Sequence, residues 1–203
     1  MRAARYIIPL ALILLSPSRI FAQPDAFQVR YASHLEIGDS VVNISNTGST
    51  GAGLPRGNIC VNVYTFDAAE EMISCCACLV TPNALSSLSA RGDLVSNSFS
   101  PGVPTSIVIG LVASTPNGNQ CDAGSVTSAN LAAGLRAWGT TLHALPGSPT
   151  KFGFTEDDFL WSTLSAPELN QLTSFCHFIE KNGSGFGICA SCRFAGMSGA
   201  KQQ

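Results

Sequence analysis

The chain has 203 residues, of which 11 are Lys or Arg, 13 are Asp or Glu and eight are Cys. Only 12% of the residues are charged, which is about half the share in an ordinary soluble domain. Nucleic-acid binding needs clustered Lys and Arg, so a composition with no basic excess excludes it. The hydrophobic content of 45% is too high for a chain that is disordered throughout.

The first 22 residues have the three parts of a secretory signal peptide. Arg2 and Arg5 give a positive end, residues 6–16 form an apolar run, and Ala22 is a small residue at the expected cleavage position. The run is too short for a membrane anchor, because crossing the hydrocarbon core takes about 20 residues. We therefore expect a secreted or periplasmic protein in which residues 23–203 form a single domain with no membrane segment. Cleavage would remove three arginines and leave a net charge of −5.

Alternating or continuous apolar residues predict strands along most of the expected mature chain. Residues 67–71 separate the two clearest strands, which should form a hairpin with a five-residue loop. The expected strands are residues 27–32, 40–45, 59–66, 72–80, 106–114 and 140–145.

Two segments are less clear. Residues 82–94 are expected to form a short helix or helical turn, because their leucines recur at helical spacing. Residues 130–145 are ambiguous, since Leu131, Leu135 and Trp138 would share one face of a helix although the end of the segment alternates like a strand.

Helices are expected near residues 155–181. Thr155 and Asp158 resemble a capping pair, and Ser165 with Glu168 forms a better capping box at the start of an apolar helical repeat. The fold class that follows is α+β, with an antiparallel β-sheet or sandwich, C-terminal helices packed on it, and disulfide stabilisation.

The cysteines are even in number and, in the oxidising compartment expected for an exported chain, indicate disulfides. Sequence alone does not determine which cysteine pairs with which. The candidates are Cys60, Cys75, Cys76, Cys78, Cys121, Cys176, Cys189 and Cys192.

Strand geometry narrows the pairing. The expected hairpin would place Cys60 opposite Cys78, and a two-residue shift would place it opposite Cys76, because side chains alternate between the faces of a strand. Cys75 would point to the other face, where Cys121 is its simplest partner.

In the C-terminal part, Cys176 on the expected helix could form a disulfide with Cys189 or Cys192.

Two alternatives to structural disulfides stay open. The cysteines of residues 75–78 together with Cys189 and Cys192 have short spacings that suit tetrahedral zinc. Cys189-x-x-Cys192 could also act as a thiol–disulfide oxidoreductase, although no thioredoxin-like strand–helix pattern precedes it.

No other pattern indicates catalysis. His34, His143 and His177 stand alone, and the sequence contains neither G-x-S-x-G nor H-E-x-x-H. The acidic run 156–158 lacks the spacing of a calcium loop and is explained by the preference for negative charge in the first turn of a helix. The glycine-rich residues 183–187 are interpreted as a hinge rather than a dinucleotide loop. We therefore predict no catalytic residue, no cofactor and, apart from the zinc alternative, no metal.

Aromatic residues gather in the last third of the chain. Their spacing favours a core between helix and sheet, and the alternative is an exposed surface for a carbohydrate or protein partner. They are Phe152, Phe154, Phe159, Trp161, Phe175, Phe178 and Phe186.

Residues 58–66, 75–83 and 183–193 resemble a group of uncharacterised secreted, cysteine-containing bacterial proteins. This resemblance implies secretion and supplies no activity and no site residues. Residues 39–48 are similar to the opening of secreted immunoglobulin-like modules.

The expected function is non-catalytic binding or interaction at the cell surface, with a protein or carbohydrate partner. The alternatives are a secreted enzyme or thiol–disulfide oxidoreductase, or a cysteine-based zinc site.

Overall fold

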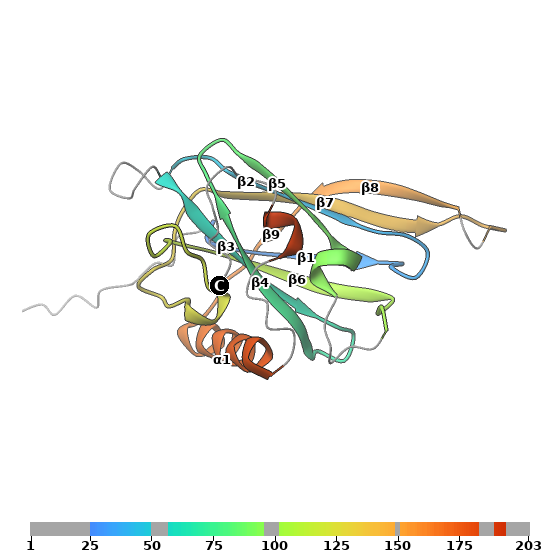
Figure 1. Ribbon diagram of the computed structural model, residues 1–203. Coiled ribbons are helices and arrows are strands. Elements are labelled where there is room, and N and C mark those ends of the chain that lie inside the picture. The colour runs from blue at the N-terminus through green and yellow to red at the C-terminus, as the bar shows by residue number, and fades with distance from the viewer. Residues whose placement is uncertain (1–24, 50–56, 96–101, 149–150, 183–188, 194–203) are drawn as a thin grey trace, which may run out of the picture.

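The structure, a computed structural model, describes residues 25–49, 57–95, 102–148, 151–182 and 189–193. The expected signal peptide and the glycine-rich segment 183–187 lie outside these ranges. Two antiparallel sheets pack face to face, and one helix covers the outer face of the first sheet (Figure 1). The expected α+β class with an antiparallel sandwich, a C-terminal helix and disulfides is confirmed.

The first sheet, sheet A, has five strands in the order β4-β3-β6-β1-β9. Sheet B has four strands in the order β5-β2-β7-β8. The strands of sheet A are β1 (Phe27–Ser33), β3 (Ile59–Phe66), β4 (Met72–Val80), β6 (Ser106–Ser114) and β9 (Leu160–Trp161). Those of sheet B are β2 (Val41–Asn46), β5 (Leu85–Ser89), β7 (Leu135–Ala144) and β8 (Phe152–Asp158).

The main core lies between the two sheets. Alternate residues of β2, such as Val42 and Ile44, point into it, as expected for a strand with one solvated face. Strands β3 and β6 are buried on both faces, because helix α1 (Ala166–Asn182) and the short 3-10 turn η3 (Ala123–Ser125) cover the outer side of sheet A. This double burial explains their continuous apolar sequences.

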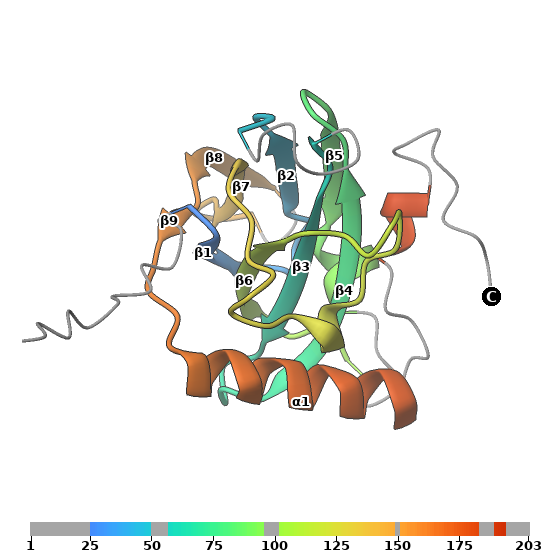
Figure 2. The ribbon, with the colours of Figure 1, turned by 90° about the vertical axis from the view of Figure 1, so that its left-hand side faces the viewer.

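Helix α1 runs across the outer face of β3, β4 and β6 (Figure 2). The expected capping box is present, because the Ser165 backbone N–H donates to Glu168 Oε2 at 2.8 Å and Ser165 Oγ accepts from the Glu168 N–H at 3.4 Å. The helix buries Leu169, Cys176 and Ile179 against the sheet, and these residues recur at the spacing of one helix face.

Two expectations about secondary structure are wrong, and one open alternative is decided. Residues 155–158 belong to strand β8 and not to a helix, because they pair with β7 in a long hairpin. Residues 82–94 contain strand β5 followed by a π-helical turn, η2 (Ala90–Leu94). Residues 135–144 form β7 throughout, which decides the ambiguous segment in favour of the strand expected at 140–145 and extends it backwards. In each case pairing with a distant strand overrides a local preference.

The β3–β4 hairpin has the expected five-residue loop, but its register differs by one residue from the expected one. Cys60 lies opposite Leu79, and Val61 lies opposite Cys78. Because side chains alternate along a strand, a shift of one residue moves Cys60 to the other face. The expected Cys60–Cys78 and Cys60–Cys76 bridges are therefore excluded by geometry.

All eight cysteines form disulfides and none is free. The expected partners of Cys75 and Cys176 are also wrong, because these two bond to each other under α1. The expectation that Cys75 faces away from Cys76 and Cys78 is confirmed. The bridges are Cys60–Cys121, Cys75–Cys176, Cys76–Cys189 and Cys78–Cys192.

Three of the four bridges start from β4 and end in the C-terminal part of the chain. Two of these hold η4 (Ala190–Arg193), a 3-10 turn that packs against β5 at the edge of the sandwich. Across the ranges that the structure describes, no helix combines the length and apolar character needed to span a bilayer.

Candidate functional site

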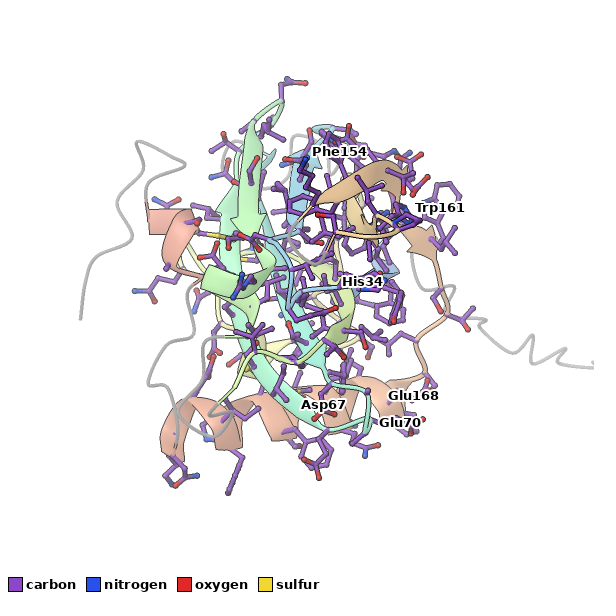
Figure 3. All side chains as sticks on the ribbon, turned by 90° about the vertical axis from the view of Figure 1, so that its right-hand side faces the viewer. His34, Asp67, Glu70, Phe154, Trp161 and Glu168 are labelled. Atoms are coloured by element: carbon purple, nitrogen blue, oxygen red, sulfur yellow. A yellow bond between two sulfur atoms is a disulfide. The ribbon has the colours of Figure 1, made fainter. Side chains whose placement is uncertain are left out.

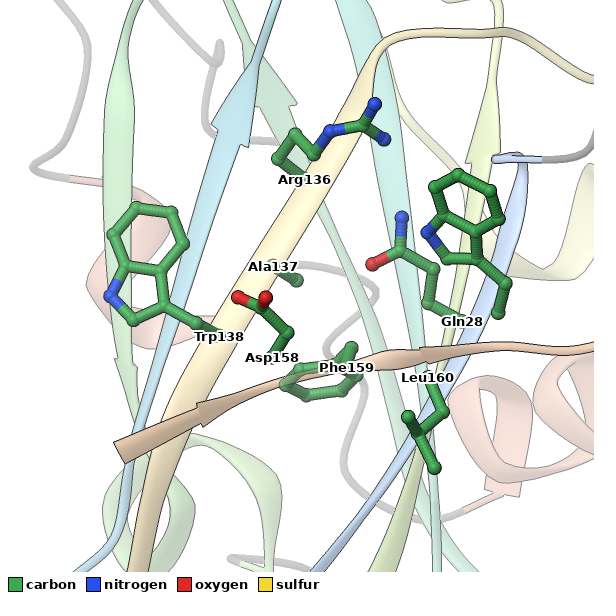
Figure 4. Close-up of a pocket in the computed structure, with 8 residues that line it drawn as sticks. Gln28, Arg136, Ala137, Trp138, Asp158, Phe159 and Leu160 are labelled. Atoms are coloured by element: carbon green, nitrogen blue, oxygen red, sulfur yellow. The ribbon is translucent and has the colours of Figure 1, made fainter. Parts of the chain in front are cut away.

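The chain changes sheets between β8 and β9, and a hollow lies at this corner of the sandwich. Phe159 makes the transition, with its backbone N–H donating to Ala137 O at 2.9 Å and its ring only 3% exposed. The hollow has a volume of about 460 Å³ and is open to solvent (Figure 4). It is lined by Gln28, Arg136, Ala137, Trp138, Asp158, Phe159, Leu160 and Trp161.

Both tryptophans of the sequence line this hollow. Trp161 is 60% exposed and projects from the surface, as Figure 3 shows. Trp138 is half-buried and lies opposite Asp158 in the β7–β8 pairing. Large aromatic side chains are normally buried, so the exposure of Trp161 is unusual.

Arg136 lies over the ring of Trp161. The guanidinium carbon of Arg136 lies 5.5 Å from the centre of the indole ring, which is the range of a cation–π interaction. Arg136 Nη1 also donates to Leu135 O at 3.1 Å and lies 3.9 Å from Asp25 Oδ2. Arg136 therefore contacts both the indole and the segments next to it.

The floor of the hollow is rigid. Gln28 is 1% exposed, and its side-chain Nε2 donates to Leu135 O at 3.0 Å and to Asp25 O at 3.3 Å. The bond to Leu135 O ties β1 of sheet A to β7 of sheet B at the hollow.

The acidic run 156–158 belongs to β8 and not to the first turn of a helix, so that explanation is wrong. Asp157 lies 3.8 Å from Arg30 Nη2, and its backbone O accepts from Arg30 Nη1. The side chain of Arg30 is 6% exposed and also donates to Thr141 Oγ1 at 2.8 Å. Burial lowers the pKa of Arg30, while the charge of Asp157 opposes this shift. This contact fastens the β7–β8 hairpin to sheet A.

The histidines do not form a catalytic group among the described residues. His34 Nδ1 lies 3.1 Å from Glu36 Oε1, and both side chains are exposed. His143 Nε2 lies 3.0 Å from Thr155 Oγ1 on the β7–β8 hairpin. His177 lies on the exposed side of α1.

A second polar cluster lies where α1 packs on η3. Burial raises the pKa of Glu180 to about 7, and the nearby charge of Asp122 adds to this effect. Burial also raises the pKa of Tyr64, whose hydroxyl donates to Ala123 O at 2.7 Å. The Tyr64 hydrogen bond ties η3 to β3 of the sheet, and Glu180 lies beside η3 on the helix.

The expectation that the late aromatic residues form a core is wrong for most of them. Phe159 is buried, whereas the other described members are exposed, and Phe186 lies outside the described residues. Trp138, which contributes to the hollow, lies in the segment that sequence left open between helix and strand. Extending the strand pattern of residues 140–145 backwards puts Trp138 on the same face as Leu142, so the pattern alone predicts a core position and not a place in the hollow. The exposed members are Phe152, Phe154, Trp161, Phe175 and Phe178.

Comparison of the chain with protein-family models, curated proteins and solved structures finds no match. The resemblance to secreted bacterial proteins therefore stays a prediction. The functional inference depends on the geometry of the corner hollow and of the cysteine bridges.

Proposed function

We propose that the protein is an exported, non-catalytic binding protein whose ligand is a carbohydrate of the cell surface. The observation that carries this proposal is that both tryptophans of the chain line one open hollow, with Arg136 over the ring of Trp161. Sugar rings have apolar faces that stack on flat aromatic rings and hydroxyl groups at their edges. A site that combines aromatic surface with a few placed polar groups suits both features.

The polar groups around the indoles favour a carbohydrate over a charged ligand. Asp158 accepts hydrogen bonds, and Arg136 donates them, so hydroxyl groups can be bound from either side of a ring. The opposite charges of these two residues nearly cancel within the hollow. A strongly anionic or cationic ligand would gain attraction from one of them and repulsion from the other.

Export is supported by the disulfides. Four bridges that use every cysteine are typical of an oxidising compartment, which is extracellular or periplasmic. The pairing does not favour the alternative of a thiol–disulfide oxidoreductase. A dithiol catalyst cycles through a bridge between its own two cysteines, whereas Cys189 and Cys192 each bond to a different cysteine of β4.

The test is binding of the purified protein to a panel of cell-wall polysaccharides and soluble oligosaccharides, measured by calorimetry. Trp161→Ala and Trp138→Ala should each weaken binding roughly 30-fold, the effect of losing a hot-spot aromatic worth about 2 kcal/mol. Phe154→Ala is the matched control, because Phe154 is 66% exposed on β8 but does not line the hollow. Binding that survives both tryptophan changes would refute the proposal.

A further inference from the structure

Two of the disulfides lie side by side at the edge of the sandwich. Cys76 bonds to Cys189, and Cys78 bonds to Cys192. The Sγ atoms of Cys78, Cys189 and Cys192 all lie within 4.8 Å of one another. Since Cys76 Sγ is bonded to Cys189 Sγ, four sulfur atoms from distant parts of the chain occupy one small volume.

Three of the four sulfurs, those of Cys78, Cys189 and Cys192, lie close enough together to share one metal ion, and Cys76 Sγ is bonded to one of them in the oxidised chain. Zinc binds thiolates at about 2.3 Å, which places the sulfurs of a tetrahedral site about 3.8 Å apart. Cys76 and Cys78 share one face of β4, and Cys189 and Cys192 are three residues apart at the 3-10 turn η4. A strand and a turn each supply two ligands at short spacing, as in structural zinc sites.

We propose that Cys76, Cys78, Cys189 and Cys192 bind one Zn²⁺ as a tetrathiolate site when their two bridges are reduced. Each bridge takes two electrons from a dithiol, which becomes a disulfide, and the two protons released by that dithiol convert the cysteine sulfurs to thiols. Two equivalents of dithiol therefore give four thiols. Zn²⁺ then displaces the four protons, because only the thiolate form of cysteine binds the metal.

Contacts that do not involve sulfur would keep the turn in place after reduction. The Ser191 N–H donates to Asp93 Oδ1 at 2.7 Å, and Ser191 Oγ donates to Asp93 Oδ2 at 2.6 Å. Asp93 is itself held, because its Oδ2 accepts from the Ser89 N–H at 2.8 Å. The Cys192 N–H donates to Cys189 O at 3.0 Å, which keeps the turn closed.

The four cysteines are mostly buried, as in a structural metal site, and solvent reaches only one of them. Cys76, Cys78 and Cys189 are buried in the main core, whereas Cys192 is partly exposed. Apolar surroundings disfavour bare thiolates and so favour their neutralisation by a cation. The other two bridges begin on the opposite face of sheet A, where Cys75, Cys176 and Glu180 offer only two sulfurs.

The experiment uses the full mature chain, reduced with a phosphine without oxygen and titrated with Co²⁺ as a spectroscopic substitute for Zn²⁺. We expect one equivalent of Co²⁺ per chain to give the visible absorption of a tetrahedral thiolate complex. One equivalent of Zn²⁺ should abolish that absorption. Circular dichroism before and after the titration reports whether the metal-bound chain is folded.

Two double variants, each lacking one bridge, are a matched pair. Cys60→Ser with Cys121→Ser should keep the cobalt spectrum and the affinity, since this bridge lies outside the cluster. Cys78→Ser with Cys192→Ser should lose the tetrathiolate spectrum and bind at least tenfold more weakly. The proposal is overturned if the reduced wild type gives no stoichiometric tetrahedral spectrum, if metal leaves it unfolded, or if both variants bind alike.

Discussion

Replacing Glu180 by Gln should stabilise the protein at pH 8 and leave its stability at pH 4 nearly unchanged. Glu180 lies at the end of α1 that packs on η3, where it is partly buried and close to Asp122. The pKa of its carboxyl is raised from 4.5 to about 7, first by desolvation and then by the charge of Asp122. The folded state therefore holds this proton more tightly than the unfolded state.

The sign of the pH dependence follows from this difference. Below pH 4.5 the carboxyl is protonated in both states, so it does not penalise folding. Between pH 4.5 and about 7 the unfolded chain loses its proton first, and the free energy of unfolding falls as the pH rises. Above pH 7 the folded state carries a partly buried negative charge, and the full penalty applies.

The size of the effect can be worked from the same shift. A change from 4.5 to about 7 is equivalent to about 3 kcal/mol at about 1.4 kcal/mol per unit. Because the side chain is partly exposed, solvent screens much of this energy, and we expect about 1–2 kcal/mol. Glutamine has nearly the same shape and no charge, so E180Q should recover this amount at pH 8.

Urea denaturation of wild type and E180Q at pH 4 and pH 8 measures the difference directly. Glu71→Gln is the control, because Glu71 is an exposed carboxylate in the β3–β4 loop. A gain for E180Q that is equal at both pH values would show that the carboxyl is not the cause. A loss of stability at pH 8 would refute the reasoning about burial.

The remaining predictions concern stability. Removing the bridge under α1 with Cys75→Ser and Cys176→Ser should lower the free energy of unfolding by about 2–5 kcal/mol in urea denaturation, because it closes a long loop. Gly139→Ala should cost about 1–3 kcal/mol, since a Cβ atom there would lie 2.7 Å from Val41 O; thermal melts would report it as a lower midpoint. Ser165→Ala should cost about 1 kcal/mol through loss of the helix cap, measurable by urea denaturation.

Control variants or outcomes test the physical reason given for each of these three stability changes. Gly102→Ala should be nearly neutral, because nothing lies within 4 Å of a Cβ atom at that position. Ser165→Asp should retain most of the stability of the cap, since Asp is also a good capping residue. A Cys75→Ser, Cys176→Ser protein as stable as the wild type would show that packing alone holds α1.

The strands that sequence predicted best are those buried on both faces. Residues 59–66, 72–80 and 106–114 form strands with the expected bounds, because their continuous β-branched and apolar runs have no helical alternative. Strand β8 was missed because Thr155 and Asp158 also have the spacing of a helix cap. Only its pairing with β7 decides between a strand and the start of a helix, and the local sequence does not show that pairing.

The disulfide pairing could not be predicted either, because it depends on the register of the β3–β4 hairpin. The expected hairpin register assumed a regular ladder, whereas the pairing shifts between Thr65 and Phe66. Asp67 Oδ1 accepts from the N–H groups of Ala69 and Glu71, and Glu70 has a φ of 64°. These details of one loop decide which face Cys60 occupies.

The corner hollow was harder still to predict from the sequence. Trp138 and Trp161 line the same hollow only because the chain leaves sheet B after β8 and enters sheet A at β9. No motif or spacing marks such a change of sheet. The aromatic-rich last third of the sequence favoured a core, whereas Trp161 and most of the other aromatic residues there are exposed.

The three disulfides that start from β4 also affect how the protein is oxidised during synthesis. Cys75, Cys76 and Cys78 are synthesised 101, 113 and 114 residues before their partners. Until the end of the chain emerges, these three thiols lack their native partners and can be oxidised to wrong pairs. The protein should therefore depend on a disulfide isomerase for its yield, and a chain truncated before Cys176 should be retained as scrambled or mixed-disulfide species.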